Sequence, residues 1–287
     1  MKRRVFTALP LAAIVLGALF WEKPWGVIAV CLFFFIYGSF EYSRMLRAAG
    51  HYPLMAEGLL LTAAFLIASY WLAFDGLDIL FSVGTIGVLI SCLFRRIPVE
   101  RVVVATASTV FGALYTGYLG GFVIRLKRQG AIDGSLWGRD LLLLLFLLVW
   151  GSDSFALWVG KAIGKTPLAP ISSPKKTWEG AIGGALGALL IAAILKLTII
   201  HSLTWGDVVV VSTIIVIVGI LGDLCESLLK RGTGVKDSGG LLPGHGGVLD
   251  RIDSVLFAAP ALYYYFHFVI ATRGTEFWSL LASRIFS

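Results

Sequence analysis

Nine long apolar runs occupy most of this 287-residue chain, and they restrict its fold more than any other feature. A helix that spans a membrane needs about 20 mostly apolar residues, and lipid leaves every backbone N–H and C=O to be satisfied within the segment. We therefore expect an all-α integral membrane protein, a polytopic helical bundle with about nine transmembrane helices. The runs are Val5–Phe20, Trp25–Phe40, Leu54–Ala73, Leu77–Leu93, Val102–Ile124, Leu141–Val159, Ala181–Ile200, Val208–Leu229 and Val255–Ala271.

The composition argues against most other classes of protein. Hydrophobic residues make up 58% of the chain and charged residues only 14%, whereas a soluble domain carries about 25% charged residues. A soluble enzyme, a disordered chain and a coiled coil are therefore disfavoured. The net charge of +7 fits basic residues that flank membrane spans and contact anionic headgroups, so we expect membrane lipids and no nucleic acid as partners.

The basic residues also predict the orientation of the chain. The first run, preceded by Lys2–Arg4, resembles a signal peptide, but no clear cleavage site precedes Glu22, and we favour an uncleaved helix with a cytoplasmic N-terminus. The loops after the second, fourth, sixth and eighth runs are basic, as this orientation requires. One loop contradicts it, because its four basic residues would lie outside. They are Arg125, Lys127, Arg128 and Arg139.

The chain contains no internal repeat and no low-complexity segment, so we expect a single membrane domain over residues 1–287. Within it, residues 1–130 would form the N-terminal helices. Residues 141–271 would form the catalytic helices and loops, because most of the unexpected polar residues lie there.

The first polar region surrounds the end of the sixth run. Asp153 lies in its last turns, where an ionisable residue is costly and by default suggests a function. Ser173 and Pro174 are typical of an N-cap and a first helical position, so the pattern predicts a helix that begins there, with Lys175 and Lys176 in its first turn. A bound phosphate would explain cations at that end of a helix. Contact of both lysines with lipid headgroups is an equally open interpretation.

The second polar region joins the last two runs. Asp223, Glu226, Ser227 and Lys230 fall on one face of a helix, and Asp250 and Asp253 share a face where the next run begins. Carboxylates of this kind suit Mg²⁺, which binds one or two of them together with substrate phosphates. Acids, glycines and cations in one loop predict metal-assisted phosphoryl or nucleotidyl transfer. The alternative is a solvated hairpin, in which His245 would be a turn residue. The cations are Lys230, Arg231, Lys236 and Arg251.

These residues resemble those of a known family, the phosphatidate cytidylyltransferases or CDP-diacylglycerol synthases. The family's signature reads S-x-[aliphatic]-K-R-x4-K-D-x-[small]-x2-[apolar]-P-x-H-G-G-[apolar]-x-D-R-[apolar]-D, and this chain fills it without a gap from Ser227 to Asp253. The segments Gly222–Glu226 and Ser173–Gly180 are also similar to the family. The N-terminal half is similar mainly in hydropathy. One departure is Leu157, where family members often have Tyr.

The resemblance implies a reaction in which CTP and phosphatidic acid give CDP-diacylglycerol and pyrophosphate with Mg²⁺, in a polar cavity that faces the cytoplasm. It implies an integral protein of the bacterial inner membrane, and it leaves a second cation and a homodimer open. Asp223 and Asp250 would be metal ligands, with Asp253 a third. The catalytic group would also contain Lys230, Lys236, Asp237 and Arg251, and the substrate-binding group Asp153, Ser173, Lys175, Lys176, Ser227, Arg231 and His245.

Two other functions fit parts of the pattern. A kinase or a synthase that uses CTP and a different lipid would need the same metal chemistry. A transporter would also bury acids among its spans, but it would not need glycine-rich and cation-rich loops at one face only. A CDP-alcohol phosphotransferase would need a D-G-x2-A-R run, which the sequence lacks.

Overall fold

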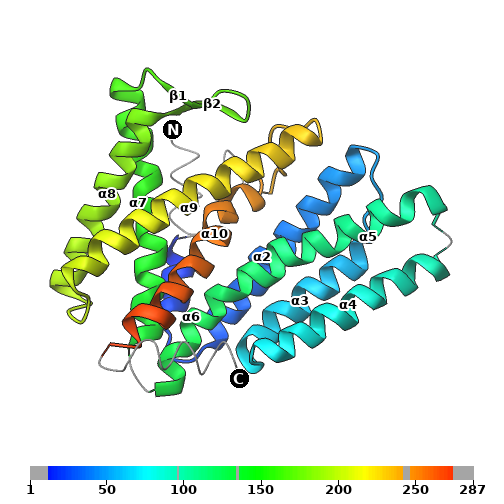
Figure 1. The fold of residues 1–287 in the computed structure, drawn as a ribbon, viewed down its shortest axis with the longest axis horizontal. Helices are drawn as coiled ribbons and strands as arrows, with labels where there is room; N and C mark the ends of the chain where they lie inside the picture. The colour runs from blue at the N-terminus through cyan, green and yellow to red at the C-terminus, as the bar shows by residue number, and fades with distance from the viewer. Residues whose placement is uncertain (1–11, 96, 134–135, 242–245, 274–287) are drawn as a thin grey trace.

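The computed structural model describes residues 12–95, 97–133, 136–241 and 246–273, and helices dominate them (Figure 1). A first helix covers residues 12–20. The next elements are α2 (Trp25–Ala48), α3 (Met55–Trp71), α4 (Phe74–Phe94), α5 (Val99–Ala113), the π-helix η1 (Leu114–Tyr118) and α6 (Leu119–Asp133). They are followed by α7 (Trp137–Ile163), β1 (Pro167–Ala169), β2 (Ser173–Thr177), α8 (Trp178–Thr198), α9 (Trp205–Gly232), α10 (Leu249–Tyr265) and the π-helix η2 (Phe266–Ile270).

The protein is a helical membrane protein, and each apolar run of the sequence overlaps a helix. Within the described residues, six helices are long and apolar enough to cross a membrane. Nine spans are therefore not confirmed. The third run forms α3, which has only 17 residues. The ninth forms the end of α10, whose first turn is acidic, and η2, which follows α10 directly. The first run lies partly outside the described residues. The six helices are Trp25–Ala48, Asp75–Phe94, Val99–Gln129, Trp137–Ile163, Trp178–Thr198 and Trp205–Gly232.

The main hydrophobic core lies among α2, α6, α7, α9 and α10, with α10 near the centre of the view (Figure 1). Each of these helices contributes fully or almost fully buried side chains, so the core joins the N-terminal helices to the helices that carry the acidic residues. Representative core residues are Phe35, Phe122, Leu144, Val216 and Leu256.

Glycines allow α7 and α8 to pack side by side (Figure 1). A Cβ atom at Gly180 would lie 2.8 Å from the carbonyl oxygen of Ala156, and one at Gly184 would lie 2.9 Å from that of Ser152. These glycines are four residues apart on one face of α8, which is the small-residue spacing typical of close helix pairs in membranes. The backbones of α7 and α8 therefore approach each other directly, and this pair positions the hairpin described next.

A β-hairpin joins α7 to α8, and it corrects one prediction. The sequence predicted a helix that begins at Ser173 and Pro174. Instead, Ser173–Thr177 forms β2, antiparallel to β1, and α8 begins at Trp178. Thr177 is the N-cap, because its side chain accepts a hydrogen bond from the Gly180 N–H at 3.2 Å. Proline is tolerated in such a two-stranded ribbon, where each strand has a free edge. Lys175 and Lys176 therefore lie on a strand and not in a first helical turn.

Three of the four basic residues that contradict the expected orientation contact helix ends. Lys127 is buried, and its ammonium group donates to the carbonyl oxygen of Leu19 at 2.9 Å, near the end of the first described helix. Arg125 and Arg128 each donate to the carbonyl oxygen of Leu72, at 3.4 Å, where α3 ends. Cations are favourable there because the C-terminal end of a helix carries partial negative charge. These side chains therefore stabilise helix ends, whichever side of the membrane they occupy.

The close approach of α7 and α8 predicts an effect of Gly184→Ala. The added methyl group meets backbone, so we expect overpacking to cost about 1–3 kcal/mol and to lower the unfolding temperature in detergent. Gly87→Ala on α4 is the matched control, because nothing lies within 4 Å of a Cβ atom there. Alanine is the better helix former by about 1 kcal/mol, so the control should be neutral or stabilising. Equal unfolding temperatures for the two variants would contradict the packing described.

Candidate active site

Three carboxylates from two helices meet at one end of the bundle. Asp223 and Glu226 lie one turn apart near the end of α9, and Asp253 lies in the second turn of α10. Their ligand atoms lie within 4.8 Å of one another. Gly222 permits this approach, because a Cβ atom there would lie 2.7 Å from the carbonyl oxygen of Asp253. The packing of α9 against α10 therefore brings the acids together.

This acidic group fits a divalent cation. Glu226 is 0% exposed. Apart from an ion pair with Lys230, its two oxygens have no hydrogen-bond partner among the described residues. Buried polar atoms normally have partners, so the Oε1 atom, which has neither a hydrogen bond nor the ion pair, suggests a missing ligand. Hard oxygen donors such as these are the ligands that Mg²⁺ prefers in proteins.

Asp250 lies outside this acidic group and makes different contacts. Its Oδ1 atom pairs with the Lys230 ammonium at 2.5 Å. Its Oδ2 atom accepts hydrogen bonds from the Gly247 N–H at 2.7 Å and the Ser238 N–H at 3.3 Å. Asp250 therefore holds the loop between α9 and α10 in place. The metal role that the sequence suggested for Asp250 stays a prediction, and Glu226 is the acid that lies beside Asp223 and Asp253.

The β1–β2 hairpin contacts the site through one lysine. Lys176 on β2 forms an ion pair with Asp223, whose Oδ1 atom also accepts a hydrogen bond from Ser227 at 3.4 Å. The base of the hairpin is closed by Glu179, which accepts from the N–H groups of Lys165 and Thr166 at 3.1 and 3.2 Å. The hairpin is thus attached both to α8 and to the acidic group.

The other predicted site residues lie around this group with different degrees of exposure. Ser173 is half-buried on β2, and Lys175 is exposed beside it. His245 lies outside the described residues. Exposed side chains at the end of α9, in the following loop and at the start of α10 complete the set. They are Arg231, Lys236, Asp237 and Arg251.

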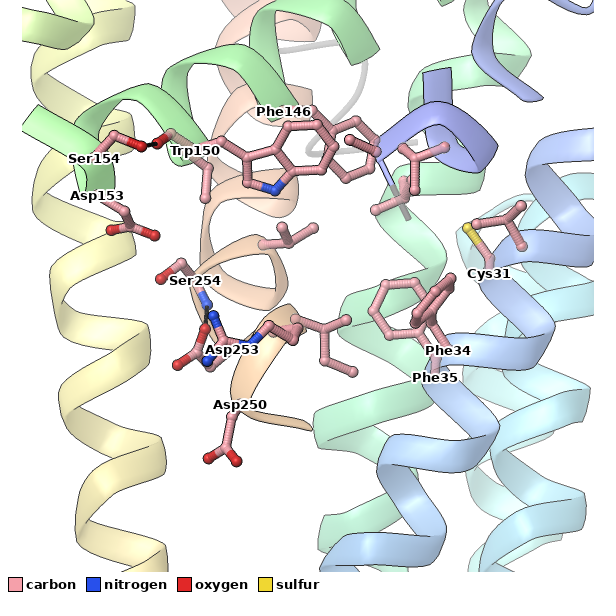
Figure 2. Close-up of a pocket in the computed structure, with 18 residues that line it drawn as sticks. Cys31, Phe34, Phe35, Phe146, Trp150, Asp153, Ser154, Asp250, Asp253 and Ser254 are labelled. Atoms are coloured by element: carbon pink, nitrogen blue, oxygen red, sulfur yellow. Dashed lines mark hydrogen bonds between the residues drawn. The ribbon is translucent and has the colours of Figure 1, made fainter. Parts of the chain in front are cut away.

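A cavity of about 410 Å³ opens beside the acids (Figure 2). Asp153 and Asp253 line one side of it, while Cys31, Phe34 and Phe35 of α2 line the opposite side. Further apolar side chains come from the first helix, α6 and α7, including Phe146 and Trp150. The cavity therefore has a charged part and an apolar part, and it connects Asp153 with the acids of α10.

Three residues near the site were missed or undervalued by sequence reasoning. The sequence places Glu226 on the acidic face, but no role was assigned to it. Glu41 is only a weak candidate in the sequence, although it is buried against the loop before α10. Tyr115 has no sequence signal. It lies in η1, and its hydroxyl is buried and has no hydrogen-bond partner among the described residues. A π-helix often marks a functional position, but the sequence does not reveal one.

Fold and site together define a helical membrane protein with a group of acidic residues beside a partly apolar cavity. The chain belongs to the cytidylyltransferase family, whose family model matches residues 2–269, and it is accordingly a nucleotidyltransferase. It is similar along most of its length to two curated phosphatidate cytidylyltransferases. The protein of Synechocystis sp. is 34% identical over 281 residues, which cover 90% of this chain and 92% of that protein. The protein of Bacillus subtilis is 35% identical over 265 residues, which cover 83% and 94%.

A third relative is more similar over a shorter stretch. The phosphatidate cytidylyltransferase of Haemophilus influenzae is 45% identical over 152 residues, which cover 52% of this chain and 53% of that protein. The match therefore spans about half the length of that relative.

The role of Glu179 gives a prediction about the hairpin. Glu179→Ala removes the acceptor for Lys165 and Thr166, so we expect the hairpin to open more often and trypsin to cleave it faster after Lys175. Glu100→Ala is the matched control, because Glu100 also lies in the first turn of a helix. Band intensities over a digestion time course would measure the rates. Equal rates for both variants would show that Glu179 does not secure the hairpin.

Proposed function

We propose that this chain is a phosphatidate cytidylyltransferase that transfers CMP from CTP to phosphatidic acid, with Mg²⁺ as its cofactor, and forms CDP-diacylglycerol and pyrophosphate. Family membership and two relatives of that name that match most of the chain support the reaction. The geometry adds one observation that favours a lipid phosphate as substrate. The cavity is apolar on one side and reaches the acidic group on the other.

A lipid phosphate would fit both parts of the cavity, with its acyl chain in the apolar part and its phosphate in the charged part. Burying acyl chain against Phe34, Phe35 and Trp150 is favourable by about 0.8 kcal/mol for each CH₂ group. The phosphate of the same lipid would then lie near Arg251, which lines the cavity beside Asp253. CTP is polar and would enter from the aqueous side, where Lys176, Arg231 and Lys236 are accessible.

The proposed chemistry is a direct transfer. An ionised oxygen of phosphatidic acid attacks the α-phosphorus of CTP, the bond from that phosphorus to the bridging oxygen breaks, and pyrophosphate leaves. The nucleophile is already ionised, so no protein base or covalent intermediate is needed, and the protein acts mainly by positioning and charge neutralisation. Asp223, Glu226 and Asp253 would hold Mg²⁺, which neutralises phosphate charge when bound. Lys176 and Arg251 would orient the two phosphate groups.

The remaining residues would shape this arrangement. Asp250 pairs with Lys230 and accepts from two N–H groups of the loop, so it would hold the loop in shape, and its metal role stays a prediction. Lys230 would also neutralise phosphate charge. Asp153 lines the charged part of the cavity and would limit where the lipid phosphate can lie, because like charges repel. Ser227 and Asp237 would contact the metal site or the nucleotide. Ser173 and Lys175 would lie beside the second phosphate-bearing substrate.

We also propose that the site faces the cytoplasm of a bacterial cell, at the inner membrane. Arg44 and Arg47 lie in the last turns of α2, one or two turns beyond Glu41, which contacts the site loop. Arg95 pairs with Glu57 at the start of α3, close to the same end of the bundle. Basic residues therefore collect at the end that carries the site, as the positive-inside rule requires of a cytoplasmic face.

Labelled CTP distinguishes this reaction from its rivals. The purified protein, reconstituted with phosphatidic acid and Mg²⁺, should move label from the α-phosphate of CTP into lipid, while label from the γ-phosphate should appear in pyrophosphate. Lipid labelled from the γ-phosphate would instead identify a kinase, for which a polyprenol should be tested as acceptor. Solute movement across vesicles without CTP turnover would identify a transporter.

The acidic group gives a prediction about metal binding. Asp223→Asn, Glu226→Gln and Asp253→Asn should each lower kcat by about 10²–10³-fold, because each removes charge that holds the cation. Each should also weaken Mn²⁺ binding, measured by electron paramagnetic resonance without substrate. Asp78→Asn, an exposed acid on α4, is the control and should change neither quantity. Near-normal activity of a site variant across a Mg²⁺ titration would remove that residue from the metal site.

A further inference from the structure

Glu41 lies far from the signature in sequence but in contact with it in space. It is 1% exposed, near the end of α2, in the half of the chain that resembles the family only in hydropathy. Its Oε2 atom accepts a hydrogen bond from the Leu249 N–H at 2.8 Å, across 208 positions of sequence. The same oxygen accepts a hydrogen bond from the Ser238 hydroxyl at 3.2 Å. One carboxylate thus holds both sides of the loop before α10.

The contact with Leu249 supplies what α10 lacks locally. The first N–H groups of a helix have no partner within the helix, and a side chain at the N-cap normally accepts from one of them. In α10 the N-cap residue is Val248, which makes no such bond. The Glu41 carboxylate takes its place from another helix, and its negative charge is favourable at the positive end of the helix. Glu41 therefore caps α10 from α2.

The glycines of the loop fit around this carboxylate. The three atoms nearest to a Cβ atom at Gly239 would all belong to Glu41. A Cβ atom at Gly247 would lie 2.5 Å from Glu41 Oε2 and 2.7 Å from the Gly239 N atom. The loop backbone therefore packs directly on the Glu41 carboxylate. A larger residue at Gly239 or Gly247 would displace either the loop or the Glu41 side chain.

Asp250 also forms hydrogen bonds with the same loop. It accepts hydrogen bonds from the N–H groups of Ser238 and Gly247. Ser238 therefore contacts both acids, with its N–H group bonded to Asp250 and its hydroxyl to Glu41. Asp250, Arg251 and Asp253 follow within the first two turns of α10, so the point where α10 begins determines where these three side chains lie. Burying a carboxylate is costly, and Glu41 Oε1 has no hydrogen-bond partner among the described residues. An apolar side chain would be cheaper if α2 needed only to pack against the loop.

We propose that Glu41 is a positioning residue for the transfer reaction: it fixes the start of α10, so that Arg251 is presented to the reacting phosphates and Asp253 to the metal site. This role rests on the proposed function. Glu41 touches neither substrate nor metal in the proposal, so it should affect the rate of the bound complex more than the binding of its components. A displacement of about 1 Å in a catalytic group can cost about 10²-fold in rate.

The decisive variant is Glu41→Gln, which keeps the size of the side chain and one acceptor but removes the charge. We expect kcat to fall about tenfold to a hundredfold, while KM for CTP and for phosphatidic acid changes less than about threefold. Ser39→Ala is the matched control. Ser39 is equally buried on the same helix, but its hydroxyl accepts from Thr62 on α3 and not from the loop. A general loosening of α2 would lower kcat in both variants, and that result would overturn the proposal.

Two further measurements test whether Glu41 caps α10 independently of its effect on the reaction rate. Hydrogen exchange of the first amides of α10 should be faster in Glu41→Gln than in Ser39→Ala, whether or not the chain turns over CTP. Unchanged exchange would refute the capping role even if activity fell. Ser238→Ala removes one donor to Glu41 and can replace Glu41→Gln if that variant does not fold. Its effect on kcat should be smaller and non-additive with that of Glu41→Gln, whereas additive effects would contradict action through the shared loop.

If the wild-type chain fails to place α-phosphate label in lipid, the proposed function fails by itself. The exchange experiment then still decides whether Glu41 caps α10.

Discussion

A single buried ammonium group ties together the two helices that carry the site. Lys230 of α9 pairs with Glu226 on its own helix and with Asp250 on α10. Removing one partner from a buried ion pair costs about 3–5 kcal/mol, so this link strongly favours one arrangement of the two helices. Asp223 and Asp253 lie beside Glu226, and Lys176 of the hairpin pairs with Asp223.

The sequence was sufficient to predict the helices, because lipid leaves no other way to satisfy the backbone of a long apolar segment. It did not predict the number of spans. The length of an apolar run does not show whether a helix crosses fully, as α3, which has 17 residues, illustrates. The start of α8 was also wrong, because Ser173 and Thr177 are both suitable caps and only the pairing of β2 with β1 selects Thr177.

The site was predictable where its residues are close in sequence. Spacing alone placed Asp223 and Glu226 on one face of a helix, and the signature located Asp250 and Asp253. Spacing could not show which acids would converge, because that depends on the closeness of α9 to α10 at Gly222. Glu41 was out of reach for a different reason. Its partners lie about 200 positions away, and a carboxylate at the edge of an apolar run is equally consistent with a solvated helix end.

Helix α2 links the two substrate environments of the proposed reaction. Phe34 and Phe35 line the apolar side of the cavity, and Glu41, about two turns later on the same helix, holds the start of α10. Because a helix moves as a rigid unit, a shift of α2 would move the wall against the lipid chain and the acids of α10 together. Groups held on rigid elements keep their catalytic geometry better than groups on loops. In the proposed reaction, the N-terminal half would therefore contribute to the chemistry, although the signature lies entirely in the other half.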